Sequence, residues 1–192
     1  MAGLSRLLAG RRAVLWLALA LALTLMLWSR PGVARQAASE GQVKAAYLFK
    51  FAGFVEWPEG SFARPDSSLQ IGVAGSDALA EQLELMVAGR SIGGHAISVR
   101  KIRRGEPVAG IHILFVGAAE RAAMAELLAA ARGQPVLTVS DADDAVALGC
   151  MIAFVIADQR LRFDVGMAHV AAARLRISAR MLAAANRILG VT

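Results

Sequence analysis

Hydrophobic positions fall into one long run near the start of the chain, several short apolar runs, and longer stretches with helical spacing. The short runs are typical of strands buried on both faces of a sheet, except for one that alternates apolar and polar residues. They predict strands at 69–74, 96–102, 111–116 and 136–139. The stretches with helical spacing predict helices at 40–55, 78–88, 118–131 and 169–189.

Two further apolar segments, 151–157 and 161–165, flank Asp158-Gln159-Arg160, which predicts a hairpin. Strands that alternate with helices are typical of an α/β fold. The hairpin adds an antiparallel pair. We therefore predict a single three-layer α/β domain at residues 40–190, with a mixed β-sheet and helices on both faces.

The long apolar run, 13–28, is 16 residues long and follows Arg6, Arg11 and Arg12. It is shorter than the ~20 residues that span a bilayer. With small residues after it, this pattern predicts a signal peptide at 1–34 cleaved after Ala34; 37–39 offers a second site. An uncleaved inner-membrane anchor is the alternative. Either one places the domain outside the cytoplasm, which in a bacterial cell means the periplasm.

The export segment also explains the charge. The chain has a net charge of +6, but four of its 21 basic residues and none of its 15 acidic residues lie in the first 34. The remainder carries 17 basic and 15 acidic residues, a net charge of +2. This balance gives no support to nucleic-acid binding.

The sequence has no H-E-x-x-H motif, no cysteine pair and no Walker lysine, so we predict no enzyme activity and no cofactor. A periplasmic hydrolase would need a nucleophile and base that the sequence does not bring together. The histidines, His95, His112 and His169, are far apart and lack metal-ligand spacing, so no metal site is expected. His112 lies in an apolar run and is predicted to be a hydrogen-bonded core histidine.

Cys150 is the only cysteine, so no intramolecular disulfide can form. It lies at the edge of an apolar run and is predicted to be a small buried hydrophobic residue. An intermolecular disulfide and a catalytic thiol are the alternatives.

Two predicted strands end in a Ser-Asp pair, Ser76-Asp77 and Ser140-Asp141. Backbone N–H groups at a helix start can hold an anion, and ligands of α/β sheets bind at the carboxyl ends of strands. These four residues are therefore candidate ligand-binding residues. Plain helix capping is the alternative.

The helix predicted at 40–55 is apolar almost all round. Val43, Tyr47, Phe51 and Phe54 share one face, and Phe49 points roughly opposite. Such a helix is either wedged between layers of its own domain or shared with another chain. Arg176 and Arg180 lie one turn apart on the predicted last helix, with Arg187 roughly in line; they either form a solvated face or attract an acidic partner or anionic headgroups. The candidate partner-binding residues are Lys44, Tyr47, Phe49, Phe51, Trp57, Arg176 and Arg180.

Several segments in order resemble the YfiR family, over roughly residues 40–190. They are 43–58 (VKAAYLFKFAGFVEWP), Ile71-Gly72-Val73 with Gly75, 112–116, 135–141, Gly149 with Met151-Ile152, Arg162-Phe163 and Ile177-Ser178. The resemblance implies a dimeric periplasmic regulatory protein. It would bind the periplasmic part of an inner-membrane diguanylate cyclase and hold it inactive, which lowers cyclic-di-GMP and biofilm formation.

This chain departs from the family pattern at two places. The resemblance implies a cysteine where Ile111 stands and disulfide pairs elsewhere, and Cys150 occupies a position where glycine is usual. Redox control through a disulfide is therefore not expected here. The alternative function is a periplasmic small-ligand sensor acting on another membrane receptor. A third possibility is an exported scaffold domain, which would bind neither a ligand nor a signalling partner.

Overall fold

The computed structural model describes residues 31–190, with side chains from Glu40 onward. Residues 1–30, which hold the apolar run of the predicted signal peptide or anchor, lie outside the described residues. The chain divides into two units, and the second, Glu40–Thr192, is the compact domain. Among the helices of the described range, none has the length and apolar character needed to cross a membrane.

The main sheet has eight strands in the order β10-β8-β7-β6-β5-β2-β4-β3. Its central strands are parallel, whereas β7 with β8 and β3 with β4 are antiparallel, so the predicted mixed sheet is confirmed. A separate two-stranded ladder joins β1 (Val55–Glu56) to β9 (Arg176–Ile177). The strands of the main sheet are β2 (Leu69–Ala74), β3 (Ser91–Ile92), β4 (His95–Lys101), β5 (Ile113–Val116), β6 (Leu137–Ser140), β7 (Ile152–Ala157), β8 (Arg160–Gly166) and β10 (Arg187–Leu189).

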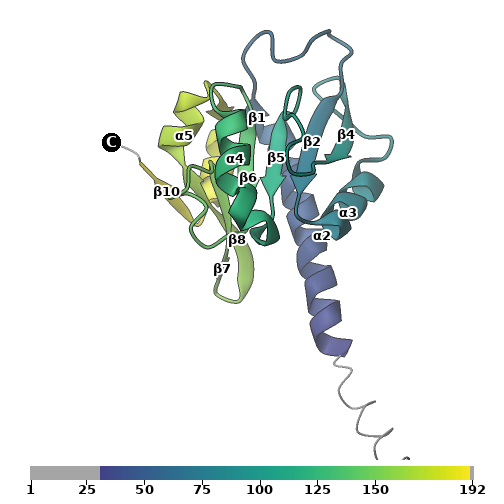
Figure 1. The fold of residues 1–192 in the computed structure, drawn as a ribbon, viewed down its shortest axis with the longest axis vertical. Helices are drawn as coiled ribbons and strands as arrows, with labels where there is room; N and C mark the ends of the chain where they lie inside the picture. The colour runs from purple at the N-terminus through teal and green to yellow at the C-terminus, as the bar shows by residue number, and fades with distance from the viewer. Residues whose placement is uncertain (1–30, 191–192) are drawn as a thin grey trace, which may run out of the picture. The chain divides into compact units, whose positions relative to one another are not determined.

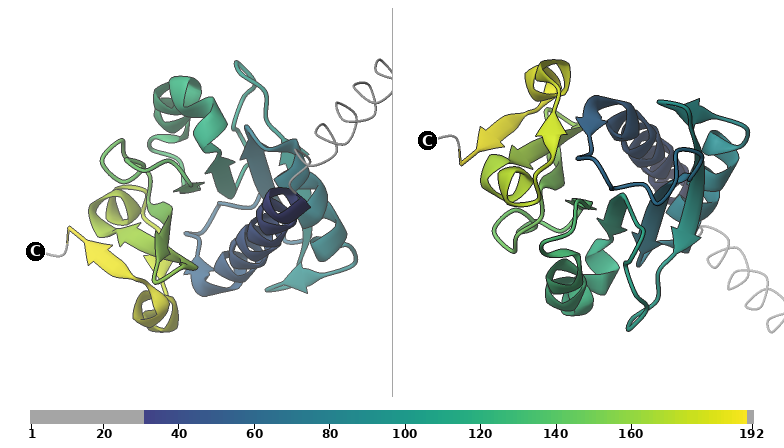
Figure 2. Two further views of the ribbon diagram at one scale, coloured as in Figure 1. Left: turned by 90° about the horizontal axis from the view of Figure 1, so that it is seen from below. Right: turned by 90° about the horizontal axis from the view of Figure 1, so that it is seen from above.

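Helices lie on both faces of the sheet, as predicted. They are α2 (Pro31–Phe54), α3 (Asp77–Val87), the short 3-10 turn η1 (Ala118–Glu120), α4 (Arg121–Ala131), α5 (Met167–Ala172) and α6 (Ala179–Ala184). Helix α4 lies in front of the sheet in Figure 1, and α2 passes behind it; the two views of Figure 2 agree. This arrangement produces two hydrophobic cores.

The first core, called here the aromatic core, joins α2, α3, α5 and α6 to one face of the sheet. Its large buried side chains include Leu48, Phe51, Phe115 and Phe163. The second, called here the alanine-rich core, packs α4 against the opposite face. Successive residues of a strand point to opposite faces, which explains why Phe115 belongs to the first core and Leu114 to the second. The continuous apolar runs that predicted the strands therefore supply both cores.

The single helix predicted at 169–189 is wrong. The segment forms α5, β9, α6 and β10 in succession. Its alanine and arginine content favours helix, but local propensity is a weak term that tertiary contacts override. Arg174 adopts a positive φ of 59°, which breaks the helix, and Ile177 then pairs with Val55 of β1. Ser178 caps α6 by accepting a hydrogen bond from the Met181 backbone N–H.

Candidate functional site

Aromatic residues of α2 lie mostly inside the domain. Phe51 is 1% exposed, and its ring centroid lies 5.0 Å from that of Phe163. Tyr47 is half-buried, lies 5.5 Å from Phe163 between ring centroids, and donates a hydrogen bond to the Leu161 carbonyl at 3.4 Å. The helix is thus wedged into its own domain along this face. The structure gives no support to partner contact by Phe51, because its side chain is inaccessible.

Lys44 and Asp141, which the sequence placed in separate candidate sites, form one ion pair. The Lys44 Nζ lies 2.6 Å from Asp141 Oδ2 and also 2.6 Å from Glu40 Oε1. Burial lowers the pKa of Lys44, but its hydrogen bonds to the two carboxylates outweigh burial and raise that pKa overall. Asp141 Oδ1 also accepts from the Ala118 backbone N–H at 2.6 Å. The pair therefore ties α2 to the carboxyl ends of the strands and to the start of η1 and α4.

The predicted ligand residues at the strand ends are used within the protein. Ser76 caps α3 by accepting from the Leu79 N–H, and the buried Ser140 hydroxyl accepts from the Ala142 N–H. Asp77 is exposed. Since Asp141 occupies the Ala118 N–H that an anion would use, these contacts favour capping over ligand binding.

A surface at the end of α2 brings together residues that are far apart in the chain. The β1–β9 ladder pairs Glu56 with Arg176, and their side chains form an exposed ion pair at 3.7 Å. Trp57 follows β1, and Arg180 is exposed on α6. We call Glu56, Trp57, Arg176 and Arg180 the α2-exit surface. The two arginines do not share a helix, contrary to the prediction, because Arg176 lies in β9.

Trp57 and Phe49 both pack against the aromatic core and are partly buried. The Trp57 ring packs edge-on against His112, with centroids 6.0 Å apart. Its indole N–H is buried and finds no acceptor among the described residues. Phe49 is half-buried, with the Arg90 guanidinium 5.2 Å from its ring centroid. Both side chains are anchored in the domain and partly accessible.

His112 is a hydrogen-bonded core histidine, as predicted. Its Nδ1 accepts from the Gln70 backbone N–H at 3.1 Å, so Nε2 carries the proton and donates to the Ser61 carbonyl at 3.1 Å. The Phe62 ring stacks between His112 and His95. Burial lowers the pKa of His112, which the Ser61 carbonyl opposes and the His95 charge reinforces. The neutral ring therefore holds the segment around Ser61 against the sheet.

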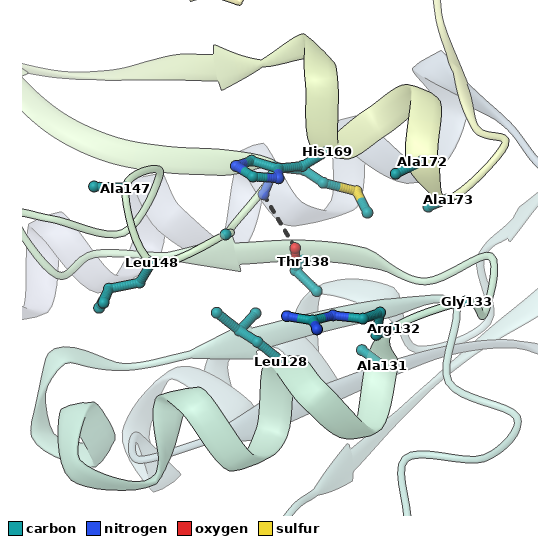
Figure 3. Close-up of a pocket in the computed structure, with 12 residues that line it drawn as sticks. Leu128, Ala131, Arg132, Gly133, Thr138, Ala147, Leu148, His169, Ala172 and Ala173 are labelled. Atoms are coloured by element: carbon teal, nitrogen blue, oxygen red, sulfur yellow. Dashed lines mark hydrogen bonds between the residues drawn. The ribbon is translucent and has the colours of Figure 1, made fainter.

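A pocket that was not predicted from the sequence lies between α4 and α5. It has a volume of about 510 Å³. Figure 3 shows Leu128 and Arg132 on one side, His169, Ala172 and Ala173 on the other, and Thr138 of β6 between them. The Thr138 hydroxyl accepts from the Met151 N–H at 3.0 Å. Because α5 was predicted as part of a longer helix, its position beside α4 could not be anticipated.

A family model described as YfiR/HmsC-like matches residues 41–186. This chain belongs to the YfiR/HmsC-like family. The match spans almost all of the compact unit, so it concerns the whole domain rather than one motif. No curated protein matches the chain. The resemblance inferred from the sequence is therefore confirmed at the level of the family.

Cys150, the only cysteine of the sequence, lies two residues before β7. The side chain is completely buried, as predicted. Burial raises the pKa of its thiol to about 12, against the opposing effect of a hydrogen bond with Thr138. The thiolate is the reactive form, so this thiol is unreactive at neutral pH. Ile111 is also buried, in the alanine-rich core, where it contributes packing.

Proposed function

We propose that this protein is a periplasmic regulator that binds the periplasmic part of an inner-membrane diguanylate cyclase and keeps it inactive. The observation that carries the proposal is the YfiR/HmsC-like match over residues 41–186. The export pattern of residues 1–34 supports a periplasmic location. Inhibition lowers cyclic-di-GMP and disfavours biofilm.

Inhibition by binding is a population shift. The regulator must bind the inactive conformation of the cyclase more tightly than the active one, since equal affinity for both shifts nothing. A compact domain whose α2 is fixed by core packing and by the Lys44–Asp141 pair offers a pre-organised surface for this purpose. Pre-organisation reduces the entropy lost on binding.

We propose the α2-exit surface as the contact region, with Phe49 of α2 as a further anchor. It combines an aromatic ring, Trp57, with the two exposed arginines, Arg176 and Arg180. Tryptophan and arginine are the residue types enriched at interaction hot spots. Arg180 has no ion-pair partner among the described side chains, so an acidic group of the cyclase could approach it.

The first test measures intracellular cyclic-di-GMP in the source organism with and without the gene. We expect the level to rise on deletion and to return when the full chain is expressed, but not when a version lacking residues 1–34 is expressed. No rise under several growth conditions would exclude the cyclase role and leave another membrane receptor as the partner.

A second test locates the contact surface. Arg176→Glu should abolish repression by the complementing gene, and the charge swap Glu56→Arg with Arg176→Glu should not restore it. Restoration by the swap would show that only the internal ion pair matters. Arg103→Glu, an exposed change on the loop after β4, is the matched control and should repress normally. Phe49→Asp should reduce repression while the melting temperature shows that the domain still folds.

The family resemblance also implies a homodimer, and light scattering on the purified protein checks this. Fractionation should recover the protein in the periplasm when the signal is cleaved, or with the inner membrane when it is retained as an anchor.

A further inference from the structure

We propose that the pocket between α4 and α5 binds a small amphipathic carboxylate, with the carboxylate at Arg132 and the apolar body between the two helices. This inference goes beyond the proposed function and does not depend on it, because none of the residues of the α2-exit surface lines the pocket. The pocket is lined by Leu128, Ala131, Arg132, Gly133, Thr138, Ala147, Leu148, Gly149, Met151, His169, Ala172 and Ala173.

The size and lining of the pocket fit a small ligand. Its volume of about 510 Å³ lies in the range of known small-molecule sites, roughly 300–1,000 Å³. Leucine, methionine and alanine side chains form most of the walls. Leu148 is 42% exposed, although it is a large apolar residue at the rim. An apolar ligand body would cover this surface and gain hydrophobic free energy.

The charged group at the pocket is positive. Arg132 follows the last turn of α4, and its side chain runs along the pocket toward Leu128 (Figure 3). It forms no ion pair with any described side chain, and no aspartate or glutamate lines the pocket. A guanidinium binds a carboxylate through two parallel hydrogen bonds. The charge of the pocket therefore favours an acid over an amine or a neutral alcohol.

His169 and Thr138 contribute polarity without competing for the carboxylate. The His169 Nε2 donates to the Val146 carbonyl at 3.1 Å, so Nδ1 can accept a hydrogen bond from a donor group of a ligand. The Thr138 hydroxyl is engaged with the Met151 N–H. The pocket thus offers one positively charged group, the exposed Arg132, and a largely apolar lining, which is the pattern expected for an amphipathic acid.

Three eight-carbon probes test the proposal on the purified full chain: octanoate, octanol and octylamine. Binding is followed by calorimetry and by amide chemical shifts in nuclear magnetic resonance spectra. We expect octanoate to bind at least tenfold more tightly than the other two and to shift the amides of Thr138, Leu148 and His169. Equal affinity for all three probes, or shifts located elsewhere, would overturn the proposal, and so would no binding by any of them.

Two variants and a control locate the binding groups. Arg132→Gln should weaken octanoate at least tenfold and leave octanol unchanged. Ala172→Phe, at an exposed position of α5, should fill the pocket and abolish binding of all probes. Arg160→Gln, an exposed arginine of β8 away from the pocket lining, should bind octanoate normally. Unchanged binding by Arg132→Gln, with a melting temperature like that of the parent, would show that the pocket does not recognise the carboxylate.

Discussion

The two faces of the sheet are packed with different kinds of side chain. On the α2 face, Tyr47, Phe51 and Phe163 interlock with ring centroids 5.0–5.8 Å apart. On the α4 face, the buried residues include no aromatic side chain; six of the sixteen are alanines, among them Ala123 and Ala131, beside Met124 and the α4 leucines. Large aromatic side chains fill space between a helix and a sheet, whereas alanines leave space unless the backbones approach closely.

This difference explains where the pocket lies. The aromatic core joins α2, α3, α5 and α6 to the sheet, and its largest side chains are completely buried. The pocket lies at the border of the two cores: Leu128 and Ala131 of the alanine-rich core and Met151 and Ala173 of the aromatic core line about 510 Å³ of open space beside Thr138. The aromatic packing therefore fixes the fold and the α2-exit surface, and the border with the alanine-rich core leaves room for a ligand. Four predictions test this contrast.

The largest expected effect comes from a matched pair of leucine truncations. Leu48→Ala, in the aromatic core at 0% exposed, should lower the free energy of unfolding by about 3–5 kcal/mol. Leu128→Ala should cost only about 1–2 kcal/mol, because one side of Leu128 already faces the pocket and makes fewer contacts. Urea denaturation measures both values.

Leu85→Ala is the control for this pair. Leu85 is 82% exposed on α3, and its truncation should change stability by less than about 0.5 kcal/mol. Equal losses at Leu48 and Leu128 would contradict the contrast between the two cores.

Asp141 links the two faces, so its removal should affect both. Asp141→Ala removes the partner of Lys44 and the acceptor for the Ala118 N–H, and should cost about 2 kcal/mol. Asp141→Asn keeps an acceptor for Ala118 but loses the charge, so its loss should be smaller. A double-mutant cycle with Lys44→Met measures the coupling; a value near zero would mean that the pair does not hold α2.

Acid should destabilise the folded protein through protonation of His112, which packs beside the aromatic core. Since burial lowers its pKa in the folded protein below the ordinary 6.5, the unfolded chain binds more protons in the interval between the two values. The contribution of His112 to the free energy of unfolding is therefore fully present above about pH 6.5. It is lost as the pH falls toward the pKa of His112 in the folded protein. Melting temperatures between pH 7.5 and 5.5 measure this slope.

The control for the pH effect is His112→Asn, whose amide oxygen can still accept from the Gln70 N–H. This variant should be less stable at pH 7.5 but show a flatter pH dependence. A slope identical to that of the parent would assign the titration to another group.

The smallest effect on stability is expected at the α2-exit surface. Glu56 and Arg176 are both exposed, so breaking their ion pair by Arg176→Ala should change the free energy of unfolding by at most about 0.5 kcal/mol. Chemical denaturation checks this value. A loss above 1 kcal/mol would mean that Arg176 stabilises the β1–β9 ladder, and its loss of function could then not be assigned to partner contact.

Local patterns were sufficient to predict most of the fold. The strand at 69–74 and the helix at 118–131 were predicted with nearly the observed bounds, because apolar runs and helical spacing are properties of neighbouring residues. His112 and Cys150 were correctly predicted to be buried for the same reason. The candidate sites were harder to predict. A helical projection places Tyr47 and Phe51 on one face of the helix but does not show whether that face contacts the core or a partner.

The sequence by itself therefore determined the α/β class, the family and most of the buried strands. Only the tertiary structure decided that Lys44 meets Asp141, 97 positions further along the chain, and that Arg176 joins Glu56 through a two-residue ladder. It alone divided the last helix and placed α5 beside α4 to form a pocket. The reason is physical: propensity acts over a few residues, whereas burial and strand pairing depend on segments that only folding brings together.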